Sequence, residues 1–140
     1  MGGANFINAY AGGNIVTKSF VKAVSGSPGK FVQAGANDIV VGAVGMNLKY
    51  PQGLGGSATL VAESGDSVEV IGPGDTAEVT LGGTVTEGAY VKSDGSGFAV
   101  ASLLTGTTKQ NVAGICLRGG GNGEVGLILM WPYQNIPALA

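Results

Sequence analysis

Few residues of this 140-residue chain could take part in catalysis. The sequence contains no histidine, the side chain that most often serves as a general base or a metal ligand near neutral pH. Its single cysteine, Cys116, alternates with apolar neighbours and is expected to be a small buried side chain rather than a reactive thiol. No serine, threonine or cysteine stands beside a recognisable base. We therefore expect no enzyme activity, and neither a metal ion nor a cofactor.

Carboxylates are the remaining groups that could do chemistry. A pair of acids for glycoside hydrolysis would have to come from Glu63, Asp66, Glu69 and Asp75. Strand alternation places such residues on a solvated sheet face, and the spacing of an EF-hand calcium loop is absent. A small enzyme with an unrecognised carboxylate site is the weakest alternative.

One glycine pattern matches a nucleotide-binding motif. Residues 121–126 read Gly-Asn-Gly-Glu-Val-Gly and satisfy G-x-G-x-x-G. That motif binds a pyrophosphate only where a helix N-terminus follows the glycines. Here the apolar run 125–131 follows, which is typical of a strand, so the sequence predicts a glycine-rich hairpin.

The elements that must position these residues are strands. Short runs rich in valine, separated by many of the 27 glycines, indicate an all-β fold. Asp94–Gly95 and Asn122–Gly123 should each supply the positive φ of a hairpin turn, and Pro73–Gly74 should form a type II turn. We expect most of 58–131 to be an antiparallel meander. The expected strands are 15–24, 30–34, 39–46, 58–62, 67–71, 77–81, 89–92, 98–101, 112–117 and 125–131.

The expected architecture is a single compact antiparallel β-barrel or sandwich-like domain with extended N- and C-terminal arms. Residues 1–14 form the N-terminal arm, 15–131 the β domain with a long loop at 47–57, and 132–140 the C-terminal tail. Pro132 and Pro137 should prevent the last strand from continuing. The arms and the loop carry isolated large side chains, which we expect to contact a partner protein. These interface candidates are Phe6, Ile7, Tyr10, Tyr50, Leu54, Trp131 and Tyr133.

Charge argues against nucleic acid as a partner. The chain has a net charge of −2, and Arg118 is its only arginine. Residues 50–91 carry six acidic residues and no basic one, which predicts either a solvated sheet face or a patch complementary to a basic neighbour. No apolar run is long enough to cross a membrane, and the N-terminus lacks the features of a secretory signal, so we expect synthesis in the cytoplasm.

Four stretches, taken in order, resemble the cement or decoration proteins of tailed-phage capsids. The resemblance implies a protein of the virion that binds the outer surface of an assembled shell, commonly as a homotrimer. It would clamp neighbouring subunits of the major capsid protein and would be made in the host cytoplasm. Its loop 47–57 and proline-containing tail depart from that pattern. The stretches are 19–22, 37–44, 66–95 and 111–116, with the glycine hairpin and terminal strand after them.

Two other functions are also compatible with the sequence. A carbohydrate- or ligand-binding β-module of a virion fibre or a surface adhesin would use an aromatic platform beside an amide, and Tyr50 with Gln52 is the local cluster of that kind. Another structural subunit, such as a tail or minor capsid piece, would share the same size and composition.

Overall fold

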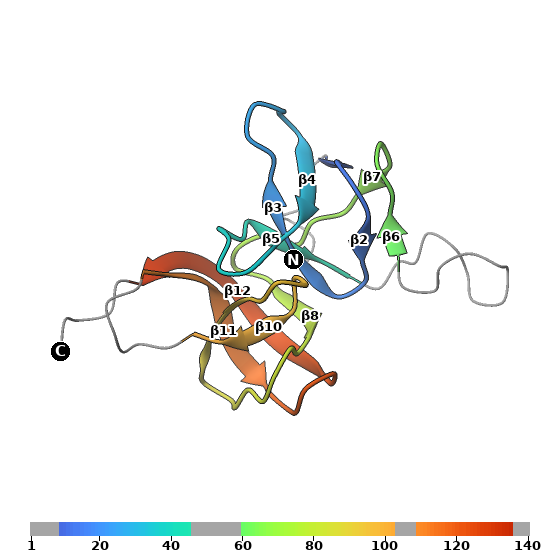
Figure 1. Ribbon diagram of the computed structural model, residues 1–140. Helices are drawn as coiled ribbons and strands as arrows, with labels where there is room; N and C mark the ends of the chain where they lie inside the picture. The colour runs from blue at the N-terminus through green and yellow to red at the C-terminus, as the bar shows by residue number, and fades with distance from the viewer. Residues whose placement is uncertain (1–8, 46–59, 103–108, 136–140) are drawn as a thin grey trace, which may run out of the picture.

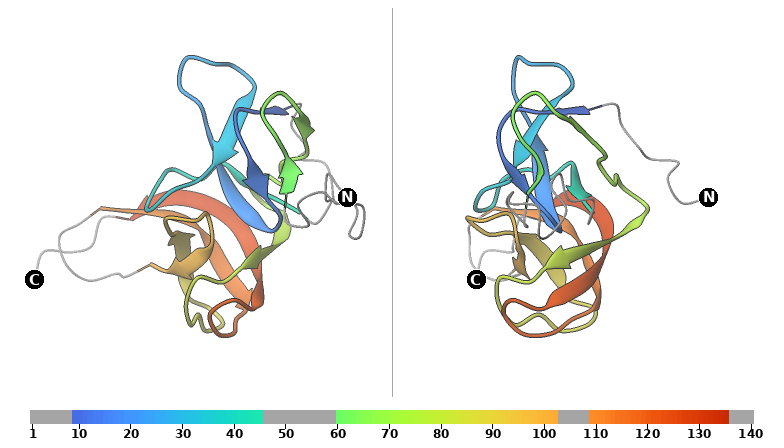
Figure 2. Two further views of the ribbon diagram at one scale, coloured as in Figure 1. Left: turned by 45° about the vertical axis from the view of Figure 1, so that its right-hand side comes forward. Right: turned by 90° about the vertical axis from the view of Figure 1, so that its right-hand side faces the viewer.

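The protein is all-β, as expected from its sequence. The computed structural model describes residues 9–45, 60–102 and 109–135, which form twelve strands and, within those ranges, no helix. The strands of the N-terminal half and those of the C-terminal half make two neighbouring layers (Figure 1). Two further views show the layers packed as one body (Figure 2).

The first sheet has the strand order β5-β3-β4-β1-β7. β1 lies within the range predicted as an arm, yet it pairs with β4 in parallel and with β7 antiparallel, so the sheet is not wholly antiparallel. The single strand expected over 15–24 is divided, because Lys18 adopts a left-handed φ of 53°. The strands are β1 (Ala9–Ala11), β3 (Ser19–Ala23), β4 (Lys30–Gln33), β5 (Gly42–Val44) and β7 (Ser67–Val68), with β2 (Ile15–Val16) and β6 (Leu60–Ala62) forming a separate pair.

The second sheet has the strand order β10-β9-β11-β12-β8 and curls toward a barrel. Its two edges meet where Leu81 forms a bridge with Ala99, and the Gly82 amide donates to the Ala99 carbonyl at 2.8 Å. The strands are β8 (Thr76–Thr80), β9 (Tyr90–Ser93), β10 (Ala99–Ala101), β11 (Gln110–Arg118) and β12 (Val125–Asn135).

The predicted meander over 58–131 is wrong in its first part. The turn at Pro73 forms, with the Asp75 amide donating to the Gly72 carbonyl at 3.5 Å. However, β7 before this turn belongs to the first sheet and β8 after it belongs to the second. The turn therefore carries the chain from one sheet to the other instead of closing a hairpin.

Both predicted hairpins form, β9 with β10 and β11 with β12. Gly123 has the expected positive φ of 86°, but in the other hairpin the positive φ of 79° falls on Gly97 rather than on Gly95. The reason is the Asp94 carboxylate, whose Oδ1 accepts from the amides of Ser96 at 2.8 Å and Phe98 at 3.0 Å. This side chain holds a wider turn than two residues would give.

The prediction that Pro132 ends the last strand is also wrong, because β12 continues to Asn135. Val112 pairs with Tyr133 and Gly114 with Met130, so Trp131 and Pro132 together lie opposite one residue of β11. This is a β-bulge, a place where a strand tolerates proline. β8 pairs with β12 only as far as Leu129, so Pro132 removes no ladder bond on that side.

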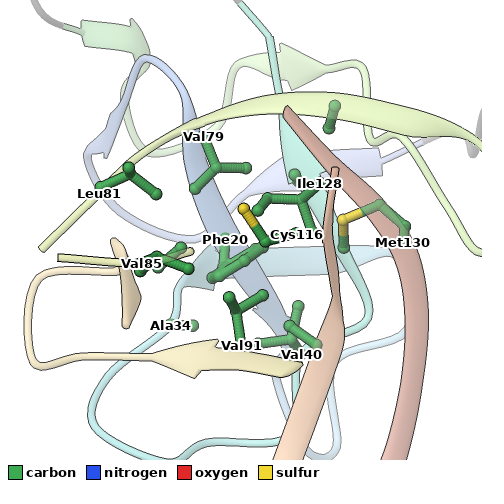
Figure 3. Close-up of a cluster of buried hydrophobic side chains, with 14 residues drawn as sticks. Phe20, Ala34, Val40, Val79, Leu81, Val85, Val91, Cys116, Ile128 and Met130 are labelled. Carbon is green, nitrogen blue, oxygen red and sulfur yellow. The ribbon is translucent and has the colours of Figure 1, made fainter. Parts of the chain in front are cut away.

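The two sheets share one hydrophobic cluster. Phe20 and Val40 from the first layer lie among Val79, Ile128 and Met130 inside the curled second sheet, each 1% exposed or less (Figure 3). A second cluster that includes Ile15, Val21 and Phe31 lies under the first sheet. The described strands therefore form one packed body.

The close approach of β11 to β12 gives a test of the fold. A Cβ at Gly114 would overlap the Leu129 carbonyl, which is backbone and cannot move aside. We expect Gly114→Ala to lower the free energy of unfolding by about 2–3 kcal/mol in urea titrations. Gly95→Ala is the matched control, since nothing lies within 4 Å of its Cβ position, and it should change stability by less than about 0.5 kcal/mol. Equal effects would contradict this account of the pairing.

Candidate interaction surfaces

Several of the carboxylates that the structure describes accept hydrogen bonds from backbone amides. Asp66 Oδ2 accepts from the Glu63 amide at 2.8 Å, and Glu124 Oε1 accepts from the Gly121 amide at 2.5 Å. Glu87 Oε2 accepts from the Gly119 amide at 2.9 Å, and this bond lowers the pKa of Glu87. Among the described residues no three His, Cys, Asp or Glu side chains gather into a group that could hold a metal ion.

Cys116 and the G-x-G-x-x-G stretch occupy the places expected for them. Cys116 is 1% exposed in the shared core, and burial, followed by the charge of Glu87, raises the pKa of its thiol. The glycine stretch forms the turn of the β11–β12 hairpin, and β12 begins within it. Neither feature offers a reactive group at the surface.

The first sheet presents an aromatic side chain at its surface. Tyr10 is 54% exposed, whereas Ala9 and Ala11 on either side of it are buried. Its cross-strand partners are Lys30 of β4 and Ser67 of β7, both exposed. Tyr10 therefore stands in a polar row on the outer face of this sheet, held by strands on both sides.

Trp131 and Tyr133 lie on the second sheet, at the bulge of β12. Trp131 is 57% exposed, whereas Tyr133 is partly buried and its ring packs edge-on against Tyr90, with centroids 5.7 Å apart and planes at 88°. Burial, and then the hydrogen bond with Tyr90, raise the pKa of Tyr133 to about 12. Tyr133 thus packs against β9, and Trp131 is the more exposed of the two.

The outer face of β11 and β12 is apolar over several residues. Ile128 and Met130 point into the core, so the alternate residues Leu127 and Leu129 face outward and remain partly exposed. Leu129 lies beside Ile115, and Ile115 beside Tyr90, in one row across three strands. We call this surface the outer strip; it consists of Tyr90, Ile115, Leu117, Leu127, Leu129 and Trp131.

A groove of about 520 Å³ lies where the loop before β5 meets the second sheet. Asp38 at its side forms a 2.8 Å ion pair with Lys22, and this contact, with the amide of Gly35, lowers the pKa of Asp38. Ile39 stands at the rim and is 61% exposed. Sequence reasoning missed this groove, since it forms between segments far apart in the chain.

Paired asparagines beside the groove join the two sheets. The Asn111 amide donates to Asn37 Oδ1 at 2.9 Å, and Asn111 Nδ2 donates to the Asn37 carbonyl at 2.8 Å. Asn37 has a positive φ of 55° and its own amide donates to the Ser93 carbonyl at 2.9 Å. Asn37 Nδ2 donates to the Lys109 carbonyl at 3.0 Å, whereas Asn111 Oδ1 is buried without a hydrogen-bond partner.

Four of the predicted interface residues, Phe6, Ile7, Tyr50 and Leu54, lie outside the described residues. The structure places Tyr10 on one sheet and Trp131 with Tyr133 on the other, so these three do not form one site. Within the described ranges, no helix has the length and apolarity that crossing a bilayer requires.

The tyrosine pair predicts how stability depends on alkaline pH. Because the pKa of Tyr133 is raised to about 12 in the folded state, the unfolded chain loses this proton first as the pH rises. The pair's contribution is complete below about pH 10 and is lost as the pH approaches 12. Unfolding by urea across this range should show the loss in wild type and a smaller loss in Tyr133→Phe. Tyr10→Phe, which leaves the Tyr90–Tyr133 contact intact, should behave as wild type.

Comparison with solved structures relates this fold to a phage protein. The chain is similar to the head fiber gp8.5 N base of bacteriophage phi29, with a TM-score of 0.58 and 16% sequence identity. The match covers 90% of this chain and 92% of that one. No protein-family model and no curated protein matches the sequence. The likeness shows that the two chains share a fold along almost their whole length.

Proposed function

We propose that this chain is a non-enzymatic structural protein of a phage virion, which binds the outer surface of the assembled capsid. There it stabilises the contacts between subunits of the major capsid protein. The observation that carries the proposal is the fold shared with the base of a phage head fibre over 90% of this chain. The sequence resemblance to capsid cement proteins points to the same place on the particle.

The described surface is compatible with a protein that acts by binding other proteins. Tyr10 and Trp131 are exposed aromatic residues on two different sheets, and aromatic side chains dominate the energy of protein interfaces when a partner buries them. One surface can therefore face the capsid while the other meets a second copy of the chain. We propose self-association as a homotrimer, with many copies on the lattice giving avidity to modest individual contacts.

Tyr10 is the contact we assign to the capsid among the described residues, together with Phe6 and Ile7, which lie just before it in the sequence. The exposed row of Tyr10, Lys30 and Ser67 offers an aromatic ring flanked by polar groups. We propose no direct contact with nucleic acid or membrane. The carbohydrate-binding alternative would depend on Tyr50 and Gln52, which lie outside the described residues, and no observation favours it.

Capsid stabilisation is tested on whole particles. Particles that carry the protein should resist heat and osmotic shock better than particles from a deletion strain, because the bound copies bridge capsid subunits. Release of packaged DNA on heating, followed by dye fluorescence, measures the difference, and adding purified chain to the deficient particles should restore it. Equal resistance of the two particles would overturn the stabilising function.

The contact assigned to Tyr10 is tested by co-sedimentation with purified shells. We expect Tyr10→Ala to weaken binding about tenfold or more, the usual effect of truncating an aromatic interface residue. Ile39→Ala is the matched control, because Ile39 is a similarly exposed large side chain at the groove. If both variants bind shells as wild type does, Tyr10 is not a capsid contact.

A further inference from the structure

We propose that the outer strip is the surface through which copies of this chain meet, with Arg118 of each copy paired to Glu78 of the next. The inference rests on the proposed function only for the self-association that it explains. The occupant of the strip is thus a second copy of the same chain.

The first reason is the apolar character of the strip. Trp131 is 57% exposed and Leu117 45% exposed, and both flank the partly exposed Leu127 and Leu129. On ordinary sheets the face away from the core is polar, and contiguous apolar surface marks a contact with another protein. Two aliphatic residues with a tryptophan beside them have the composition of an interface centre.

The second reason is the position of two opposite charges. Leu127 is in register with Arg118 on β11 and with Glu78 on β8, so the charges lie on opposite sides of the apolar column of β12. Within one chain Arg118 Nη2 and Glu78 Oε2 are 3.5 Å apart, with their side chains 58% and 50% exposed. An ion pair this exposed contributes little stability, so exchanging it for a pair between two copies costs little.

The third reason is geometric. Consider copies arranged around an axis parallel to β12, with their outer strips turned toward that axis. The β8 side of one copy then meets the β11 side of the next, which brings Glu78 against Arg118 at every contact. The same pairing arises for two copies or for three, so a cyclic assembly closes with its charges satisfied.

The exposed edge of the same strand argues against a different mode of contact. A partner that added a strand beside β12 would need its backbone donors beyond Met130, since the Met130 amide already donates to the Asp75 carbonyl at 2.9 Å. Pro132 lies in that stretch and has no amide hydrogen, which discourages strand addition. Copies are therefore expected to meet face to face through side chains.

Charge exchange between two variants tests the proposal on the purified full-length chain. Glu78→Arg alone and Arg118→Glu alone should each weaken self-association about tenfold in sedimentation velocity, because like charges then meet at each contact. Mixing the two variants should restore the association of a dimer toward the wild-type level and that of a trimer in part, because two of its three contacts then join opposite charges and one still joins like charges. An ion pair within one chain cannot produce this rescue, since neither variant contains one.

Two further variants test the charged pair and the apolar strip separately. The double variant Glu78→Arg with Arg118→Glu should associate within about threefold of wild type. Trp131→Ser should weaken association about tenfold or more without changing the thermal unfolding midpoint, because the side chain is exposed. A monomeric wild type, or single variants that associate normally, or mixing without rescue would each overturn the proposed interface. Shell binding is measured separately, so a chain that binds shells but fails these tests leaves the capsid function standing.

Discussion

The whole structure depends on the insertion of Phe20 and Val40 into the second sheet. The curled strands alone would enclose three alanines, Ala77, Ala99 and Ala113, among their larger buried side chains. Phe20, which is fully buried, fills the space that these alanines leave, and so packing fixes one sheet against the other. The hydrogen bonds between Asn37 and Asn111 join the loop before β5 to β11. Surfaces on the two sheets are thereby held at a fixed separation.

The β11–β12 pair determines which side chains face outward. Its register shifts twice, once between Val112 and Gly114 and once between Cys116 and Arg118. Each shift adds one residue to one strand, but between the shifts the side chains alternate regularly. Ile115 and Leu117 face outward on either side of the buried Cys116, as Leu127 and Leu129 do on either side of the buried Ile128. The outer strip is therefore a product of strand alternation, and what is unusual is that its outward positions carry apolar residues.

The sequence was sufficient for most of the strands and for both hairpins, because alternation and turn residues act over a few neighbouring positions, but it missed β1 and the break at Lys18. It was not sufficient for the partners of those strands. The parallel pairing of β1 with β4, and the passage of the chain from one sheet to the other at Gly72, depend on the shared core. Pro132 was taken to end β12, since the bulge that accommodates it is visible only from the position of β11. The Asn111 amide donates to Asn37 at 2.9 Å, although the two residues are more than seventy positions apart. Such a contact produces no pattern among neighbouring residues of the sequence.

The placement of Tyr10 and Trp131 in strands changes how they would act in an interface. On arms, each side chain would have to be ordered together with its backbone when a partner binds, and that loss of conformational entropy would oppose association. Tyr10 is instead held between two paired strands, and Trp131 lies on a strand whose following residues pair with β11. Most of the backbone conformational entropy of these residues is therefore lost on folding and not on binding. A small exposed surface can then still contribute to the binding free energy. When many weak contacts are repeated over a lattice, avidity makes the buried area of each contact less important than the rigidity of the strand that holds the side chain.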